Sequence, residues 1–148
     1  MKKHTKVVII GGGIMGVSLL YHLTKEGWTD IVLVEKGELT SGSTWHAAGQ
    51  CPHFVGSYNA AKIHNYSNKL YQELEKETGQ PTGWHGCGSL RLALKEEDIN
   101  WFYYVKGILD NVGSPAEIVS KEKISSIHPF LKTDDVLCAL HTPEDGYT

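Results

Sequence analysis

Two short apolar runs and one helical repeat occupy the first 35 residues of the chain. Val7–Ile10 is an unbroken β-branched run that stops at a glycine cluster, which predicts a strand buried on both faces. From Gly13 to Glu26 apolar residues recur at helical spacing, and Gly27 is placed to end that helix. Residues 31–35, IVLVE, predict a second buried strand. A β-α-β succession of this length implies two parallel strands joined by a right-handed crossover.

The remaining sequence predicts helices and strands in alternation. The longest periodic segment, residues 58–78, should form an amphipathic helix ended by Gly79 and Pro81. Its expected apolar face comprises Ile63, Tyr66, Leu70, Tyr71 and Leu74. The other expected elements are strands at 88–94, 116–119 and 136–141, helices at 96–112 and 121–127, and a turn at 143–146. The expected fold class is α/β: a Rossmann-like βαβ unit with added helices and strands.

Composition narrows the functional classes. The chain has 148 residues, 41% hydrophobic and 21% charged, with a net charge of −3, which is typical of a globular domain with one core. Beyond Met1-Lys2-Lys3 there is no basic run, so no nucleic-acid partner is expected. The apolar runs are too short to cross a membrane, and no secretory signal is visible, so we expect a cytoplasmic protein without a membrane partner.

The cysteines do not suggest a framework of disulfides or a metal site. Cys51, Cys87 and Cys138 are scattered and odd in number, as expected for free thiols in a reducing compartment. Cys51-Pro-His53 and His85-Gly-Cys87 lack the paired ligand spacing of a zinc site. We therefore expect no bound metal.

The glycine cluster has the spacing of a dinucleotide-binding turn. Gly11-Gly-Gly-Ile-Met-Gly16 fits G-x-G-x-x-G, directly after a strand and at the start of a helix. Gly11 allows the tight turn, Gly13 lets a pyrophosphate approach the backbone, and Gly16 lets the helix pack against the strand. The amides of Gly13, Ile14 and Met15 then face the anion at the positive end of the helix dipole.

Glu35 closes the second strand, nineteen residues after Gly16. A carboxylate there accepts hydrogen bonds from the adenosine ribose and repels a 2′-phosphate. The alternative is an ordinary βαβ unit with a glycine-rich turn and a surface glutamate. The motif itself suits nicotinamide and flavin dinucleotides alike. The polar, glycine-rich return loop from Lys36 to Thr44 favours an extended FAD lying across the domain.

Three segments resemble a known flavoprotein family. VVIIGGGIMGVSLLYHL, IVLVEKGELTSGSTWHAAGQ and WHGCGSLRLAL resemble the N-terminal flavin domain of the dimethylglycine and sarcosine dehydrogenases, within the D-amino-acid oxidase-like flavoproteins. The similarity extends to the TPEDG segment, residues 142–146, and so covers essentially the whole chain. The stretch TWHAAG, residues 44–49, is its most specific element.

The resemblance implies a role for His46. In these dehydrogenases the histidine of this motif is bonded to the 8α-methyl carbon of FAD, and a neutral imidazole is a suitable nucleophile near neutral pH. The alternative is an ordinary loop histidine beside non-covalent FAD, as in some relatives. Trp45 is expected to lie beneath the cofactor in either case. The cofactor-binding residues assigned in this way are Gly11, Gly13, Ile14, Met15, Gly16, Glu35, Lys36, Gly42, Ser43, Thr44, Trp45, His46, Ala47, Ala48, Gly49 and Gln50.

The implied reaction is FAD-dependent oxidation of an N-methylated amino acid such as dimethylglycine or sarcosine. Family members are longer, and many continue into domains that bind tetrahydrofolate, so we expect an N-terminal fragment that is inactive alone. Tetrahydrofolate is a partner only where those domains exist, and neither the electron acceptor nor a catalytic residue is assigned. The alternatives are a related enzyme with non-covalent FAD and another amine or hydroxy substrate, or a non-catalytic dinucleotide-binding module.

Overall fold

A computed structural model describes residues 4–148 and divides the chain into two compact units. The first unit ends at Ala48, and the second runs from Gly49 to Thr148. No helix among the described residues is long and apolar enough to span a bilayer.

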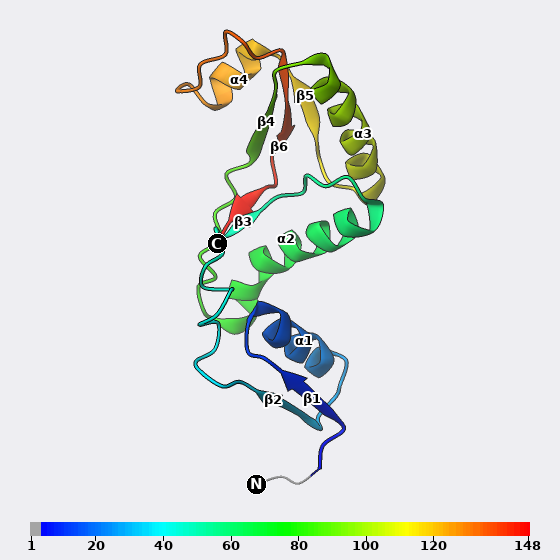
Figure 1. Ribbon diagram of the computed structural model, residues 1–148, viewed down its shortest axis with the longest axis vertical. Helices are drawn as coiled ribbons and strands as arrows, with labels where there is room; N and C mark the ends of the chain where they lie inside the picture. The colour runs from blue at the N-terminus through cyan, green and yellow to red at the C-terminus, as the bar shows by residue number, and fades with distance from the viewer. Residues whose placement is uncertain (1–3) are drawn as a thin grey trace. The chain divides into compact units, whose positions relative to one another are not determined.

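The first unit is the predicted βαβ motif (Figure 1). Strand β1, Val7–Ile10, pairs in parallel with β2, Ile31–Val34, and helix α1, Ile14–Lys25, connects them. Glu26 caps the C-terminus of the helix, and Gly27 follows in the left-handed region at a φ of 85°. The parallel crossover predicted from the sequence is therefore confirmed.

Burial of β1 on both faces was a wrong prediction. Ile9 is only 5% exposed, but its neighbours Val8 and Ile10 are 55% and 86% exposed. Successive side chains of a strand point to opposite faces, and α1 packs against one face of the two-stranded sheet. A β-branched run thus forms the strand, while the covering elements decide how many of its faces are buried.

The second unit is built on an antiparallel sheet with the strand order β4-β6-β5 (Figure 1). Its strands are β4, Ser89–Ala93, β5, Glu117–Val119, and β6, Cys138–Thr142. The helices are α2, Tyr58–Thr78, α3, Glu96–Val112, and α4, Lys121–Ile127. One core cluster joins the sheet to α2 and α3 through Ala61, Ala93, Phe102, Val105, Leu109 and Leu140. A second cluster comprises Val119, Ile124, Val136 and Ala139, of which Ile124 comes from α4.

Helix α2 has the predicted bounds, but only part of the predicted apolar face is covered: Leu70, Tyr71 and Leu74 are half-buried. Ile63 and Tyr66 are 65% and 53% exposed, whereas Ala61 and Asn68 are buried. The inward position of Asn68 follows from its side-chain amide, which donates a hydrogen bond of 3.0 Å to the carbonyl of Cys51. Asn65 similarly donates to the carbonyl of Val112 at 2.8 Å. Polar contacts with distant backbone therefore set the orientation of this helix.

A two-stranded antiparallel ribbon was not anticipated. It pairs β3, Gln50–Cys51, with β7, Gly146–Tyr147. Strand β6 also begins at Cys138, two residues later than expected, although Val136 is buried. The cysteines Cys51, Cys87 and Cys138 are free, as predicted.

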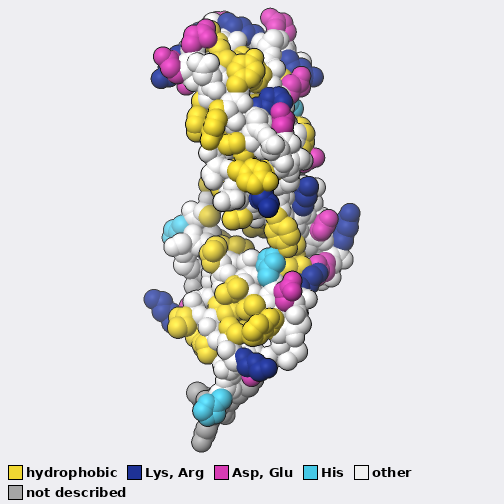
Figure 2. Space-filling view, turned by 90° about the vertical axis from the view of Figure 1, so that its right-hand side faces the viewer, with side chains coloured by type: hydrophobic (Ala, Val, Ile, Leu, Met, Phe, Trp, Pro, Cys, Tyr) yellow, Lys and Arg dark blue, Asp and Glu magenta, His cyan; other side chains and the backbone are white. Residues whose placement is uncertain are grey.

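The aromatic segment of α3 is divided between core and surface. Phe102 is buried, whereas Trp101 and Tyr104 stack on each other with large exposed areas. Figure 2 shows hydrophobic side chains in separate surface patches, interspersed with charged groups.

Candidate cofactor-binding site

The glycine turn of the first unit has the backbone geometry that a dinucleotide requires. Gly11 continues the sheet by donating from its amide to the carbonyl of Val34 at 2.8 Å, and then turns with a φ of 104°. A Cβ atom on Gly16 would overlap the carbonyl oxygen of Gly11. The helix therefore starts directly against the strand, with no acidic residue in its first turn. This arrangement suits a pyrophosphate at the positive end of α1.

Gly12 is also constrained, although the motif leaves this position open. A Cβ atom there would come within 2.5 Å of Leu39 Cδ2 and 3.1 Å of Glu35 Cβ. Sequence reasoning missed this residue because its constraint comes from a loop nearly thirty residues away. The only local signal was the triple-glycine run itself.

Glu35 follows β2 and lies against the glycine turn. Its Oε2 accepts a hydrogen bond from the amide of Gly12 at 2.6 Å, and its Oε1 accepts one from the amide of Gly37 at 2.9 Å. The hydrogen bonds from these two amides hold the pKa of Glu35 below its usual value, and the bond from Gly12 has the larger effect. The side chain is thus an anchored carboxylate with lone pairs left to accept from ribose hydroxyls.

The loop after β2 folds back over the glycine turn. The amide of Thr40 donates to the carbonyl of Gly12 at 3.0 Å, and the hydroxyl of Thr44 accepts from the amide of Ile14 at 3.0 Å. Thr44 therefore reaches the start of α1, beside the proposed phosphate position. The predicted return of this loop to the dinucleotide motif is seen in these contacts.

Trp45 and His46 lie in a series of tight turns. The amides of Trp45, His46 and Ala47 donate to the carbonyls of residues three positions earlier. The indole of Trp45 is 79% exposed, and His46 is also exposed. His46 Nδ1 lies 3.0 Å from the carbonyl oxygen of Gly42. Because a carbonyl only accepts, Nδ1 carries the hydrogen and Nε2 of the neutral ring keeps its lone pair.

The assigned residues are shared between the two units. Those from Gly11 to Ala48 belong to the first unit, whereas Gly49 and Gln50 open the second. Gly49 has a φ of 70°, and its carbonyl accepts from the amide of Thr148 at 3.0 Å. Gln50 pairs with Tyr147 in the β3–β7 ribbon.

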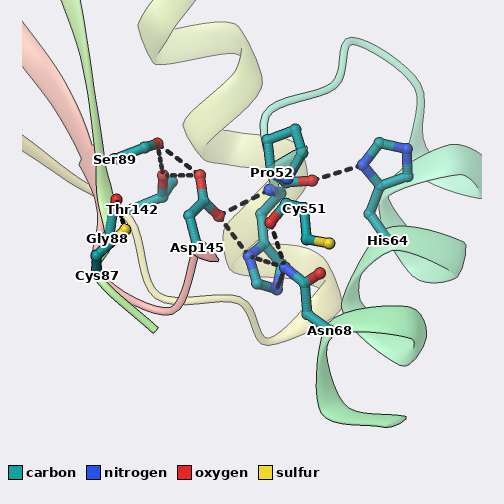
Figure 3. A network of polar contacts seen from close by, with 10 residues as sticks. Cys51, Pro52, His64, Asn68, Cys87, Gly88, Ser89, Thr142 and Asp145 are labelled. Atoms are coloured by element: carbon teal, nitrogen blue, oxygen red, sulfur yellow. Dashed lines mark hydrogen bonds and ion pairs between the residues drawn. The ribbon is translucent and has the colours of Figure 1, made fainter. Parts of the chain in front are cut away.

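A separate polar network lies inside the second unit (Figure 3). Asp145, only 2% exposed, is its centre. Its Oδ1 accepts from the amide of His53 at 2.8 Å and from His53 Nδ1 at 2.7 Å. Its Oδ2 accepts from the hydroxyls of Ser89 at 2.5 Å and Thr142 at 2.6 Å. Asn68 completes the network beside the ring of His53.

The protonation of Asp145 follows from these donors. Burial alone raises the pKa of a carboxyl group, but the hydrogen bonds from His53, Ser89 and Thr142 outweigh that effect and lower the pKa of Asp145. The network therefore holds an ionised carboxylate. Sequence reasoning placed Asp145 only in a turn, and it considered His53 only as a fragment of a metal motif. Within residues 4–148, no three potential ligands among His, Cys, Asp and Glu converge on a metal position.

Comparison with known proteins identifies the family. The model of the family "FAD dependent oxidoreductase" matches residues 6–148. The chain belongs to this family of flavoproteins. The family assignment agrees with the glycine turn, the anchored Glu35 and the Rossmann-like βαβ unit, and it confirms the flavin rather than the nicotinamide interpretation.

Three relatives show which proteins of known name the chain is similar to. Mitochondrial dimethylglycine dehydrogenase of Rattus norvegicus is 47% identical over 146 residues, which is 99% of this chain and 17% of the relative. The mitochondrial pyruvate dehydrogenase phosphatase regulatory subunit of Mus musculus is 46% identical, over 95% of this chain and 16% of that protein. Mitochondrial sarcosine dehydrogenase of Mus musculus is 34% identical, over 95% of this chain and 15% of that enzyme. The chain thus spans about a sixth of the length of these relatives.

Solved structures confirm the fold. The crystal structure of L-proline dehydrogenase from P. horikoshii superimposes with a TM-score of 0.90 at 26% identity, covering 100% of this chain and 39% of that one. The resemblance to the dimethylglycine and sarcosine dehydrogenases is therefore confirmed, as is the α/β fold class.

Proposed function

We propose that this chain supplies the FAD-binding part of an enzyme that oxidises an N-methylated amino acid of the dimethylglycine or sarcosine type. The observation that carries the proposal is the glycine turn joined to Glu35 and to the Trp45–His46 loop, in a chain 47% identical to a dimethylglycine dehydrogenase. The relative named 4-methylaminobutanoate oxidase, 33% identical, supports an N-methylated substrate.

The residues of the first unit have distinct tasks in this proposal. The amides of Gly13 and Met15 hold the pyrophosphate, and the Thr44 hydroxyl, which accepts from the amide of Ile14, lies beside them, while Glu35 accepts from the ribose. The segment from Lys36 through Gln50 runs along the cofactor. Bound FAD supplies the acceptor for a hydride from the N-methyl carbon of the substrate. None of these residues is assigned as a catalytic acid or base.

His46 is the proposed attachment residue. Its exposed ring presents Nε2 with a free lone pair, because Nδ1 donates to the carbonyl of Gly42. Ala47, Ala48 and Gly49 add little bulk beside it, which leaves room for the dimethylbenzene edge of the flavin. Attachment there would hold the ring system in one position.

Acid precipitation tests the attachment. Flavin absorbance should stay with the precipitated wild-type protein, since only a covalent cofactor survives unfolding. The variant His46→Ala should release all of its flavin, whereas His4→Ala, which removes another exposed histidine of the first unit, should retain it. Retention by His46→Ala would show that the bond forms elsewhere. Release by the wild type would show that FAD is held non-covalently, as in the alternative enzyme class.

A second candidate function is regulatory. The pyruvate dehydrogenase phosphatase regulatory subunit is almost as similar as the dimethylglycine dehydrogenase, at 46% against 47% identity. A non-catalytic flavin-binding role is therefore the main rival. Anaerobic addition of dimethylglycine or sarcosine distinguishes the two, because the flavin of the enzyme is bleached and that of a regulatory module stays oxidised. Bleaching only by another amine or a hydroxy acid would favour a different substrate class.

Other partners remain conditional in this proposal. Tetrahydrofolate would accept the one-carbon unit only in a protein that also carries the downstream domains, and the electron acceptor is unassigned. A cytoplasmic location is likewise part of the proposal.

A further inference from the structure

A hollow of about 270 Å³ lies in the second unit beside the β3–β7 ribbon. Its walls come from β3, β4 and β7 and the loops next to them, and they include Gln50, Pro52, Ser89, Arg91, Asp145 and Tyr147. At roughly 20–30 Å³ per atom, a compound of about seven non-hydrogen atoms fits in this space with room for water. The hollow therefore has the size for a small amino acid.

The buried acid in its wall is not available to a ligand. Each oxygen of Asp145 already accepts two hydrogen bonds, from His53 on one side and from Ser89 and Thr142 on the other. The hydroxyl of Ser89 donates its hydrogen to Asp145. Toward a ligand, Ser89 can therefore only accept a hydrogen bond. The charged group left to recognise a ligand is Arg91.

Arg91 is held in place without an acidic partner. Its guanidinium carbon lies 4.1 Å from the centroid of the Phe54 ring. Among the described residues, no aspartate or glutamate forms an ion pair with Arg91. Stacking on an aromatic face restrains the planar group while its N–H edge stays free to donate. A planar fork of donors is the arrangement that matches a carboxylate.

We propose that this hollow binds a small carboxylate and that Arg91 is its anchor. The identity of that ligand rests on the proposed function, under which it is the carboxylate of the N-methylated amino acid. Arg91 then determines specificity: it favours amino acids over amines that lack the acid group, and it leaves the reacting N-methyl end to the rest of the enzyme.

Binding of dimethylglycine and of its primary amide to the flavin-loaded protein tests this role. The two compounds share the dimethylammonium group and differ in the acid. Isothermal titration calorimetry should show that the wild type prefers the acid by about tenfold or more, as expected for charge-assisted hydrogen bonds. Arg91→Gln should lose that preference. Arg91→Lys, which keeps the charge but not the fork, should retain part of it.

Lys106→Gln is the matched control, because it removes one positive charge from an exposed pair with Asp110 on α3. It should leave the preference unchanged. A wild type without preference for the acid overturns the proposal, and so does a folded Arg91→Gln or Arg91→Lys variant with full preference. The binding assay needs no turnover. If the protein binds the acid through Arg91 but oxidises neither compound, the proposed function is refuted and the role of Arg91 in binding a carboxylate stands.

Discussion

At the scale of single residues, the buried carboxylate of Asp145 makes the most specific prediction about stability. Replacing it in Asp145→Asn removes the charge to which His53, Ser89 and Thr142 donate. A hydrogen bond to a charged group typically contributes about 1.5–3 kcal/mol, so urea denaturation at pH 7 should show that the free energy of unfolding falls by at least about 2 kcal/mol. Asp110→Asn, which disrupts the exposed pair with Lys106, should cost less than about 1 kcal/mol.

The effect of Asp145 should also depend on pH in one direction. Its pKa is lower in the folded state, so its contribution is complete above the unfolded value and is lost as the pH falls through the folded value. The stability gap between the wild type and Asp145→Asn should therefore narrow below about pH 4, near the ordinary pKa of an aspartate. A gap that stayed constant from pH 7 to pH 3 would show that Asp145 is not ionised in the folded protein.

At the scale of elements, the contact between β1 and α1 depends on Gly16. In Gly16→Ala the new Cβ meets the carbonyl oxygen of Gly11, so the helix must move away from the strand and displace the amides proposed to face the phosphate. We expect FAD affinity, measured by quenching of FAD fluorescence, to fall by about tenfold or more.

Gly107 provides the control for this substitution. It lies inside α3 with no atom within 4 Å of an added Cβ, so Gly107→Ala should leave FAD affinity unchanged and raise the unfolding free energy by about 0.5–1 kcal/mol. Equal FAD affinity in Gly16→Ala and Gly107→Ala would contradict the role assigned to the glycine turn.

The elements also show what local sequence patterns predict. Periodicity located α2 and α3 at their observed bounds, because many apolar positions repeat over five turns of helix. Strands β3 and β7 have two residues each, too few to show any period. The fully buried position of Asn68 on α2 was missed because its side chain turns inward to bond the backbone of Cys51, a contact that no local pattern encodes.

The same distinction applies to the candidate site. The dinucleotide turn and Glu35 are local features, with a spacing set by one βαβ unit, and the structure has them where the sequence placed them. The network of Asp145 joins residues that are 92 positions apart, from Asp145 to His53, and so was not predicted. The constraint on Gly12 was not predicted either, because it comes from Leu39 in the return loop.

At the scale of the whole molecule, the distribution of exposed apolar surface makes the last prediction. Val8 and Ile10 of β1 face solvent, whereas Ile9 between them packs beneath α1. Because threonine keeps the β-branched shape, the double variant Val8→Thr/Ile10→Thr should change the free energy of unfolding by less than about 1 kcal/mol and reduce binding of an apolar dye. Ile9→Thr should cost about 2–3 kcal/mol, because it buries a hydroxyl in place of an ethyl group. Urea denaturation compares the two. If the outward pair costs as much as Ile9, then the open face of the sheet is covered in solution, and its apolar residues contribute to stability rather than exposing surface to water.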